Sequence, residues 1–422
     1  MSTVVVAVVP GAAVGPAAIA AAVRARGLRP VFVAVAGALG APERAAYEGF
    51  GPVVECEPDA PEPALALLRP HRPCGITTFS EPLVPLTARL GDGLGLLFHE
   101  AETVTVLTDK RAQRGRLARA GVDAVRSIPV TSREEALAAV RELAGPVVVK
   151  PVHSHSSRDT HLVADAEGYP AELTPTAERP FVVEEYLRGR DEGDFGDYVS
   201  VESLVADDAV HTLGVTGKFP LLDPFREQGQ FFPSQLSPAE SGEVARLATE
   251  AARALGIRRG LVHTEIKLTA RGPRIIEVNG RLGAFIADLH RRTTGLDLLE
   301  LGIAVACGQP VEPSAPAPGD IAFQYWNLPP LAGGALRRVD GVREAEREPG
   351  LVDYVTRVPV GSELEPSVMT MRLDFLRGGA ADHAAMLRAL DRCLAPLRFT
   401  FGQPDGTART WQASRGGLCS PA

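Results

Sequence analysis

The first hundred residues alternate short apolar runs with segments of helical spacing. The apolar runs have the length of buried strands. Strands that are apolar throughout and alternate with helices are typical of a parallel sheet that helices cover on both faces. We therefore predict an N-terminal parallel α/β domain over residues 1–107. Its strands are expected over Val4–Val9, Pro30–Val35, Val53–Glu55 and Gly75–Phe79.

The pattern changes after residue 107. A helix is expected over Thr108–Gly121, with Thr108 as its cap, and a long one over Pro238–Leu255. The proline-rich stretch Gly308–Gly319 indicates a linker. We predict a second domain over residues 108–310 and a small C-terminal α+β domain over residues 311–422, with a helix over Ala380–Leu394. The strands expected in the second domain are Pro146–Lys150, Phe181–Tyr186, Tyr198–Val205, Val210–Val215, Leu261–Leu268 and Arg274–Val278.

The amino-acid composition excludes some classes of binding partner and indicates a cellular location. The net charge of −8 and the aromatic content of 5% argue against a nucleic-acid binder. The five cysteines are scattered without metal-site spacing, as in proteins of the reducing cytoplasm. Prolines and glycines interrupt the apolar segment Val4–Val23, which argues against a signal peptide or membrane span. We expect a cytoplasmic protein with small-molecule partners and no membrane contact.

Lysine is rare in this chain. The 44 basic residues include only four lysines, Lys110, Lys150, Lys218 and Lys267. A general bias toward arginine explains this, but an alternative is that lysine is kept where a compact ammonium is needed. Lys150 ends the expected strand Pro146–Lys150, and a lysine at a strand end that faces a cleft is a point-charge phosphate ligand.

The segment Leu261–Arg281 predicts an antiparallel hairpin with the five-residue loop Thr-Ala-Arg-Gly-Pro. We place Leu268 opposite Arg274. The cross-strand pairs that then share one face are Lys267–Ile275, Glu265–Glu277 and His263–Asn279. The opposite face would pack on the core through Val262, Ile266, Ile276 and Val278.

Two glutamates opposite each other in a hairpin have Cβ atoms only ~5 Å apart and should repel. A divalent cation between Glu265 and Glu277 would offset the repulsion, and Asn279 adds an amide oxygen. This oxygen-rich set suits Mg²⁺ or Mn²⁺. The simpler alternative is an exposed face whose charges point into water.

Three further segments carry weaker signals. The loop His153–His161 is rich in hydroxyl groups and fits a phosphate-covering role, with a three-histidine metal site as the alternative. The segment Phe181–Leu187 is a strand that runs into two glutamates. Exposed backbone at such a strand end can read an adenine edge, while a nearby acid holds the ribose hydroxyls. Ser80 and Glu81 follow a predicted strand and are candidates for substrate contact, although a capping role for Glu81 is the more ordinary explanation.

These segments, in this order, resemble the ATP-grasp superfamily, and within it the ATP-dependent carboxylate–amine ligases of the L-amino acid ligase type. The resemblance covers about residues 108–308. It rests on Thr108–Lys110, Val147–Pro151, Glu184–Leu187 with Gly189, Tyr198–Leu204, Glu227–Gln230 with Pro233, His263–Lys267 and Glu277–Gly283.

The resemblance implies an ATP-grasp fold between an α/β domain and a small C-terminal domain. It implies that the chain uses ATP with Mg²⁺, or Mn²⁺, to join a carboxylate to an amine through an acyl phosphate, and that it forms a homodimer as relatives often do. The implied catalytic residues are Arg281, Lys150, Glu227 and His263, and the implied metal ligands are Glu265, Glu277 and Asn279. The implied nucleotide-binding residues are Lys110, Lys150, Glu184, Glu185, Tyr186, Leu187, Asp191, Glu192 and Lys267.

The sequence departs from the family pattern in three places. The loop 153–161 contains no glycine, although the phosphate loop of the family is usually glycine-rich. The ribose-binding acid can be any of Asp191, Glu192, Asp194 and Asp197. Gln230 stands where relatives often have histidine. Two other functions therefore stay open: activation of bicarbonate or another small carboxylate, and a nucleotide-binding regulatory subunit without catalysis.

Overall fold

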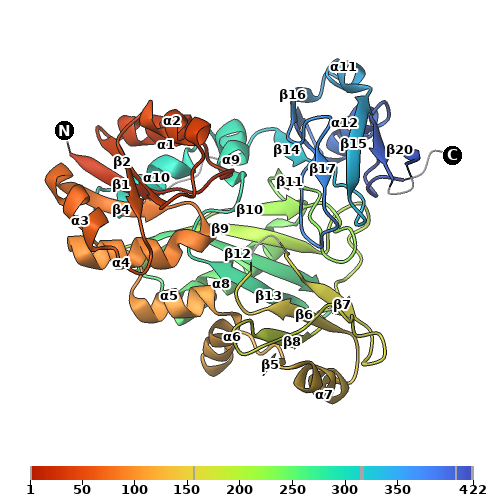
Figure 1. Cartoon of the computed structure of the whole chain (residues 1–422), viewed down its shortest axis with the longest axis horizontal. Coiled ribbons are helices and arrows are strands. Elements are labelled where there is room, and N and C mark those ends of the chain that lie inside the picture. Colours follow the sequence, from red (N-terminus) through yellow and green to blue (C-terminus); the bar gives the residue numbers. More distant parts are fainter. Residues whose placement is uncertain (1, 155–156, 314–317, 404–405, 420–422) are drawn as a thin grey trace.

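The computed structural model describes residues 2–154, 157–313, 318–403 and 406–419. Within these ranges no helix is long and apolar enough to cross a membrane. His155 and Ser156 of the predicted phosphate loop, and residues 314–317 of the predicted linker, lie outside them. In Figure 1 the N-terminal domain and the C-terminal segment lie on opposite sides of a central sheet, with a small antiparallel sheet below.

The N-terminal sheet has four parallel strands in the order β3-β2-β1-β4, which confirms the predicted parallel α/β arrangement. Its central strand is buried along its whole length, as expected where helices cover both faces. The elements are β1 (Thr3–Ala7), α1 (Pro16–Ala25), β2 (Arg29–Val35), α2 (Ala41–Glu48), β3 (Val53–Cys56), α3 (Glu62–Leu68), β4 (Pro73–Thr78) and α4 (Val84–Leu94), with short 3₁₀ turns η1 (Arg69–His71) and η2 (Glu81–Leu83).

A small antiparallel sheet in the order β5-β8-β6-β7 follows and has its own apolar core. Helices α6 and α7 lie at its outer side in Figure 1. The elements of this part are α5 (Ala101–Thr108), α6 (Lys110–Arg119), β5 (Ser127–Val130), α7 (Arg133–Leu143), β6 (Val147–Pro151), β7 (His161–Val163) and β8 (Phe181–Glu185).

The largest sheet has eight strands in the order β13-β12-β9-β10-β11-β14-β18-β16. Three of them, β14, β16 and β18, come from beyond the predicted linker, so this sheet runs on into the C-terminal segment. The elements are β9 (Tyr198–Ala206), β10 (Ala209–Lys218), β11 (Gly229–Phe232), α8 (Pro238–Ala254), β12 (Gly260–Thr269), β13 (Gly272–Asn279), α9 (Ile286–Thr294), α10 (Leu298–Ala306), β14 (Ile321–Tyr325), β16 (Leu351–Thr356) and β18 (Asp374–Ala380).

The rest of the C-terminal segment forms a second four-stranded sheet in the order β17-β15-β19-β20. Its apolar residues share a core with β14, β18 and α12. The predicted start of the last helix at Ala380 is wrong, because Ala380 ends β18. The elements are β15 (Gly334–Asp340), α11 (Val342–Ala345), β17 (Glu363–Leu364), α12 (His383–Leu394), β19 (Arg398–Gly402) and β20 (Ala408–Gln412).

The predicted hairpin is present, but its register changes partway along. The pairs His263–Asn279 and Glu265–Glu277 are as predicted, whereas Lys267 pairs with Arg274 because a bulge follows Glu265. The five-residue loop is therefore wrong: only two residues separate β12 from β13. The bulge also exchanges two side chains, since Ile275 is fully buried in the core and Ile276 lines a pocket.

Distant residues hold this bulge. Arg114 on α6 donates from Nη1 to the carbonyl oxygen of Ile275 at 2.7 Å and from Nη2 to that of Ile276 at 2.9 Å. The carboxylate of Asp123 accepts a hydrogen bond from the Ile275 N–H at 2.6 Å. Hairpin alternation alone does not reveal such contacts.

The cap of α6 also differs from the prediction. Asp109 has an extended backbone and its carboxylate accepts from the N–H groups of Arg111 and Ala112, whereas Thr108 is the last residue of α5. The Thr108 hydroxyl donates back to the Val104 carbonyl, so it is not available as a cap. Asp109 as the cap places Lys110 at the first position of the helix.

Candidate active site

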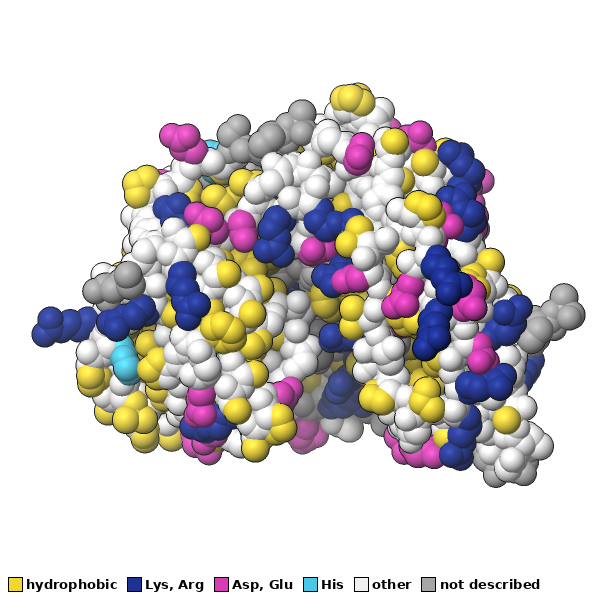
Figure 2. All heavy atoms as spheres, turned by 90° about the horizontal axis from the view of Figure 1, so that it is seen from above, with side chains coloured by type: hydrophobic (Ala, Val, Ile, Leu, Met, Phe, Trp, Pro, Cys, Tyr) yellow, Lys and Arg dark blue, Asp and Glu magenta, His cyan; other side chains and the backbone are white. Residues whose placement is uncertain are grey.

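A pocket of about 1410 Å³, counting space open to solvent, is lined by residues from the small antiparallel sheet, the large sheet and the segment before β18. All four lysines of the chain line it: Lys110, Lys150, Lys218 and Lys267. Seen from above, the surface is hollowed near its middle, with basic side chains along the hollow (Figure 2). The few lysines of this chain are thus all found at one site.

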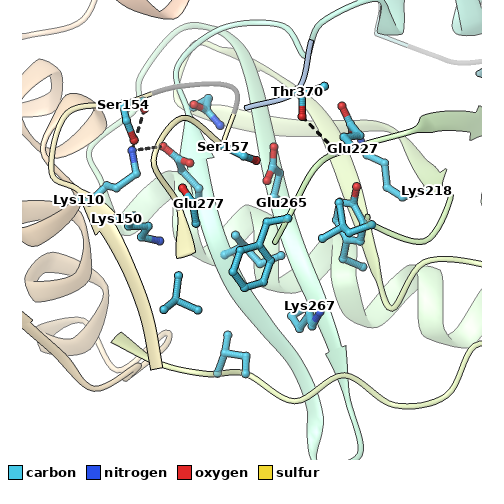
Figure 3. Close-up of a pocket in the computed structure, with 18 of the residues that line it drawn as sticks. Lys110, Lys150, Ser154, Ser157, Lys218, Glu227, Glu265, Lys267, Glu277 and Thr370 are labelled. Carbon is cyan, nitrogen blue, oxygen red and sulfur yellow. Dashed lines mark hydrogen bonds and ion pairs between the residues drawn. The ribbon is translucent and has the colours of Figure 1, made fainter. Parts of the chain in front are cut away.

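Two lysines lie at one end of this pocket (Figure 3). Lys110 Nζ donates to the carbonyl oxygen of Ser154 at 2.9 Å and lies 3.2 Å from Glu277 Oε1. Lys150 Nζ lies 2.8 Å from Glu184 Oε2. Ser157 and Thr160 of the predicted phosphate loop also line the pocket. Ammonium and hydroxyl groups converging from three segments are suited to a phosphate chain.

Glu184 is buried between two cations. Its carboxylate accepts two hydrogen bonds from Arg114, at 2.8 and 3.0 Å, in addition to the contact with Lys150. Burial alone would raise the pKa of Glu184, but Arg114 and Lys150 outweigh it and hold the pKa far below its usual value. Burial lowers the pKa of Lys150, and the neighbouring carboxylate opposes that effect.

Sequence reasoning missed Arg114, although a signal was available. It follows Lys110 by four residues on α6, and residues four apart lie on the same face of a helix.

The predicted metal ligands lie together on the hairpin. Glu265 and Glu277 are direct cross-strand partners, two pairs along the hairpin from Asn279, and all three line the pocket. Figure 3 shows the two glutamates projecting into the same space. Two carboxylates and an amide oxygen on one face form a donor set that fits Mg²⁺. Among the described residues, no group of three or more His, Cys, Asp and Glu side chains forms a metal site.

The three-histidine alternative gains no support within the described chain. His153 is exposed, and its Nδ1 is bonded to the carbonyl oxygen of Thr108 at 2.7 Å. His161 lies on β7, and His155 is outside the described residues.

The pocket continues toward Glu185, Tyr186 and Leu187, all of which line it. The Glu185 and Tyr186 N–H groups donate to the carbonyls of Arg126 and Pro146. Leu187, by contrast, forms no backbone hydrogen bond to any described residue, so its N–H and C=O are available to a ligand. An available backbone pair beside apolar walls is what reading an adenine edge requires.

The predicted ribose acids are not brought into the pocket. Asp191 accepts a hydrogen bond from the Gly193 N–H, and Glu192 is paired with Arg190. Asp197 comes nearest, because its Oδ1 lies 2.6 Å from Nζ of pocket-lining Lys267.

Glu227 lies at the other end of the pocket, beside Lys218 and Thr370 (Figure 3). Lys218 Nζ donates to Glu227 Oε1 at 2.7 Å and to Gln230 Oε1 at 3.0 Å. The Thr370 hydroxyl accepts from the Glu227 N–H at 3.0 Å. Sequence reasoning missed Thr370 and Arg372, which line this end from a segment with no motif.

Arg281 and His263 also line the pocket. Arg281 Nε lies 2.9 Å from Glu81 Oε2 of the N-terminal domain, so Glu81 contacts the site and does not merely cap a turn. His263 lies between Glu202, at 2.6 Å, and Glu265, at 3.3 Å. Burial opposes protonation of this imidazole, but the two carboxylates raise the pKa of His263 to about 9.

Comparison with known proteins agrees with this geometry. The family model described as "ATP-grasp domain" matches residues 143–288. Alanine–anticapsin ligase of Bacillus subtilis (strain 168) is 29% identical over 254 residues, which cover 55% of this chain and 53% of that protein. Carnosine synthase 1 of Gallus gallus is 34% identical over 126 residues, covering 28% of this chain and 14% of that one. The chain thus spans about half the length, or less, of these relatives.

A solved structure with the same architecture is that of L-amino acid ligase from Bacillus licheniformis. Its TM-score is 0.80 at 20% identity, over 96% of this chain and 99% of that chain. Residues 143–288 thus match an ATP-grasp domain, and ATP-grasp enzymes generally use ATP and Mg²⁺. Among proteins of this superfamily, the chain is similar in sequence to alanine–anticapsin ligase and in fold to L-amino acid ligase.

Proposed function

We propose that the chain is an ATP-dependent carboxylate–amine ligase that joins an amino acid or similar carboxylate to an amine. The observation that carries the proposal is the single pocket in which cationic side chains, opposed carboxylates and Arg281 meet. Its similarity to alanine–anticapsin ligase supports the same class of reaction.

The proposed reaction has two steps. A substrate carboxylate oxygen attacks the γ-phosphorus of ATP, and the bond from that phosphorus to the bridging oxygen of ADP breaks, which gives an acyl phosphate. The amine nitrogen then attacks the acyl carbon, phosphate leaves with the C–O bond pair, and the nitrogen loses a proton. Both steps need charge stabilisation and alignment more than a nucleophilic side chain.

The residues of the pocket supply that stabilisation in the proposed mechanism. Lys110 and Lys150 hold the nucleotide phosphates, and Arg281, held by Glu81, binds the substrate carboxylate and the acyl phosphate. Glu227 and Lys218 contact the amino acid. Glu265, Glu277 and Asn279 would hold Mg²⁺, which neutralises phosphate charge when bound.

The test uses the full chain with ATP, Mg²⁺ and hydroxylamine in place of the amine. Hydroxylamine converts an acyl phosphate into a hydroxamate, so activation of a carboxylate is detected before the natural amine is known. We expect ADP release and hydroxamate formation with at least one amino acid from a panel of carboxylates. Peptide products of productive pairs are then identified by mass spectrometry.

Three results would contradict the proposal, each in a different way. ADP release that depends on bicarbonate, without any hydroxamate from amino acids, would favour the bicarbonate-activating alternative. If hydroxamate formed only with carboxylates that are not amino acids, the activated substrate would belong to another class of carboxylic acid. Tight ATP binding without turnover over the whole panel would favour a regulatory subunit.

Replacing Lys150 by arginine, which keeps the charge, is expected to lower kcat/KM for ATP about 10²-fold. The buried site already holds the Arg114 guanidinium on both oxygens of Glu184, so a second, larger planar cation cannot take the place of the compact ammonium. ADP release at varied ATP concentration measures the effect. Lys150→Ala is the reference for complete loss of activity. An arginine variant as active as the wild type would exclude a specific role for the compact ammonium of Lys150 in phosphate binding.

The predicted homodimer and cytoplasmic location stay predictions. Light scattering of the purified chain tests the first.

A further inference from the structure

Arg372 directs a guanidinium into the substrate end of the pocket without a closely bound acid. Arg372 precedes β18 and lines the pocket, and 20% of its side-chain surface is exposed. The guanidinium carbon lies 4.4 Å from the ring centroid of Trp326 and 5.1 Å from that of Phe285. Arg372 forms no hydrogen bond to any residue that the structure describes, and its buried Nε has no acceptor.

The acid nearest to Arg372 is already paired. Glu227 Oε2 lies 3.8 Å from Arg372 Nη2, beyond hydrogen-bond distance, whereas Lys218 Nζ lies 2.7 Å from Glu227 Oε1. One carboxylate therefore faces two cations. A guanidinium shielded from water without its own counter-ion is unfavourable unless an anion joins it.

The backbone that carries Arg372 is held in place from both sides. On one side, the Asp374 carboxylate accepts from the N–H and the side-chain amide of Asn327, each at 2.8 Å, and from the Tyr354 hydroxyl at 2.9 Å. On the other side, Thr370 accepts from the Glu227 N–H. The two aromatic rings orient the guanidinium plane. Arg372 is thus pre-organised, with donors left to bind a ligand.

We propose that Arg372 is a specificity-determining residue that binds a second carboxylate of the substrates, distinct from the carboxylate that is activated. The inference rests on the proposed ligase function. A guanidinium binds a carboxylate through two parallel charge-assisted hydrogen bonds. The carboxylate comes either from an amino acid that serves as the amine or from an acidic side chain of the activated acid.

The test compares matched substrates that differ only in this group. One arm pairs an amino acid that serves as the amine with its α-amide, and the other pairs aspartate or glutamate, as the activated acid, with asparagine or glutamine. We expect the wild type to prefer the carboxylate in one arm. Arg372→Gln should reduce that preference in kcat/KM on the order of 10²-fold, mainly through KM. The arm that responds identifies the source.

Two further variants serve as controls. Arg357→Gln removes an exposed positive charge that acts on Arg372 but does not line the pocket, and should leave the preference unchanged. Arg372→Lys keeps the charge and should restore part of the preference. Thermal unfolding of all three variants checks that they fold.

If Arg372→Gln lowers kcat/KM equally for both members of each substrate pair, the proposal is overturned, since a purely structural role has that effect. Equal use of both members by an active wild type would also overturn it, while leaving the ligase function intact. If the wild type forms neither ADP nor hydroxamate with any acid, the proposed function itself fails.

Discussion

Replacing Glu277 by glutamine is expected to lower kcat for ADP formation about 10³-fold while the chain stays folded. The substitution keeps the size of the side chain and removes one of the two opposed carboxylates on the hairpin. Glutamine is a weak ligand for Mg²⁺, so the apparent Mg²⁺ constant should rise as kcat falls. Glu277 is partly exposed, and its one ion pair among the described residues is with Lys110 at 3.2 Å, so its loss should change thermal unfolding little.

The contact with Lys110 offers a competing explanation, in which Glu277 only orients that lysine. Lys110→Met separates the two, because losing a phosphate ligand should raise KM for ATP and leave the Mg²⁺ dependence almost unchanged. Glu243→Gln, on the exposed surface of α8, is the matched control for the charge change. A Glu277→Gln variant with wild-type turnover and an unchanged Mg²⁺ constant would remove Glu277 from the proposed metal site.

Short-range pattern was enough to predict part of this site. Strand alternation put Glu265 opposite Glu277 and His263 opposite Asn279, and both pairs are present. Alternation failed beyond Glu265, because the bulge depends on Arg114 and Asp123, which lie more than 150 residues away. Local pattern therefore predicts the register of a hairpin only where no distant residue forms hydrogen bonds with the backbone groups of its strands.

The parallel N-terminal sheet was predictable for a similar reason. Its strands are uniformly apolar, and β1 is buried along its length, so the pattern alone indicates cover on both faces. Partners far apart in the sequence carry no such pattern. Nothing near Glu81 indicates Arg281, and nothing near Arg372 indicates Glu227, because each pair meets only in the folded chain.

The lysines show how composition and structure complement each other. A general bias toward arginine was the ordinary explanation of their scarcity, and retention for their chemistry was the alternative. The structure brings all four to one pocket. The buried cation cluster around Lys150 was not predictable, because Arg114 is one of many arginines. That cluster is the basis of the largest expected effect on stability.

Replacing Glu184 by glutamine is expected to lower the free energy of unfolding at pH 7 by about 3–5 kcal/mol. The carboxylate is buried and contacts both Arg114 and Lys150, so its neutralisation leaves two cations without a counter-ion away from water. Urea unfolding followed by circular dichroism measures the change. Glu185→Gln is the matched control: Glu185 is 32% exposed and 3.8 Å from Arg274, so a loss below about 1 kcal/mol is expected.

The dependence on pH gives this prediction a second measurement. The two cations depress the folded-state pKa of Glu184 below the ordinary value of 4.5, so its contribution to stability is complete above that pH. As the pH falls below 4.5, the unfolded chain takes up the proton first and the contribution is progressively lost. Because glutamine is neutral at every pH, the gap between wild type and Glu184→Gln should be widest near neutrality and narrow in acid. A gap that is absent at pH 7, or that widens in acid, would show that Glu184 does not stabilise the fold as the anion of this cluster.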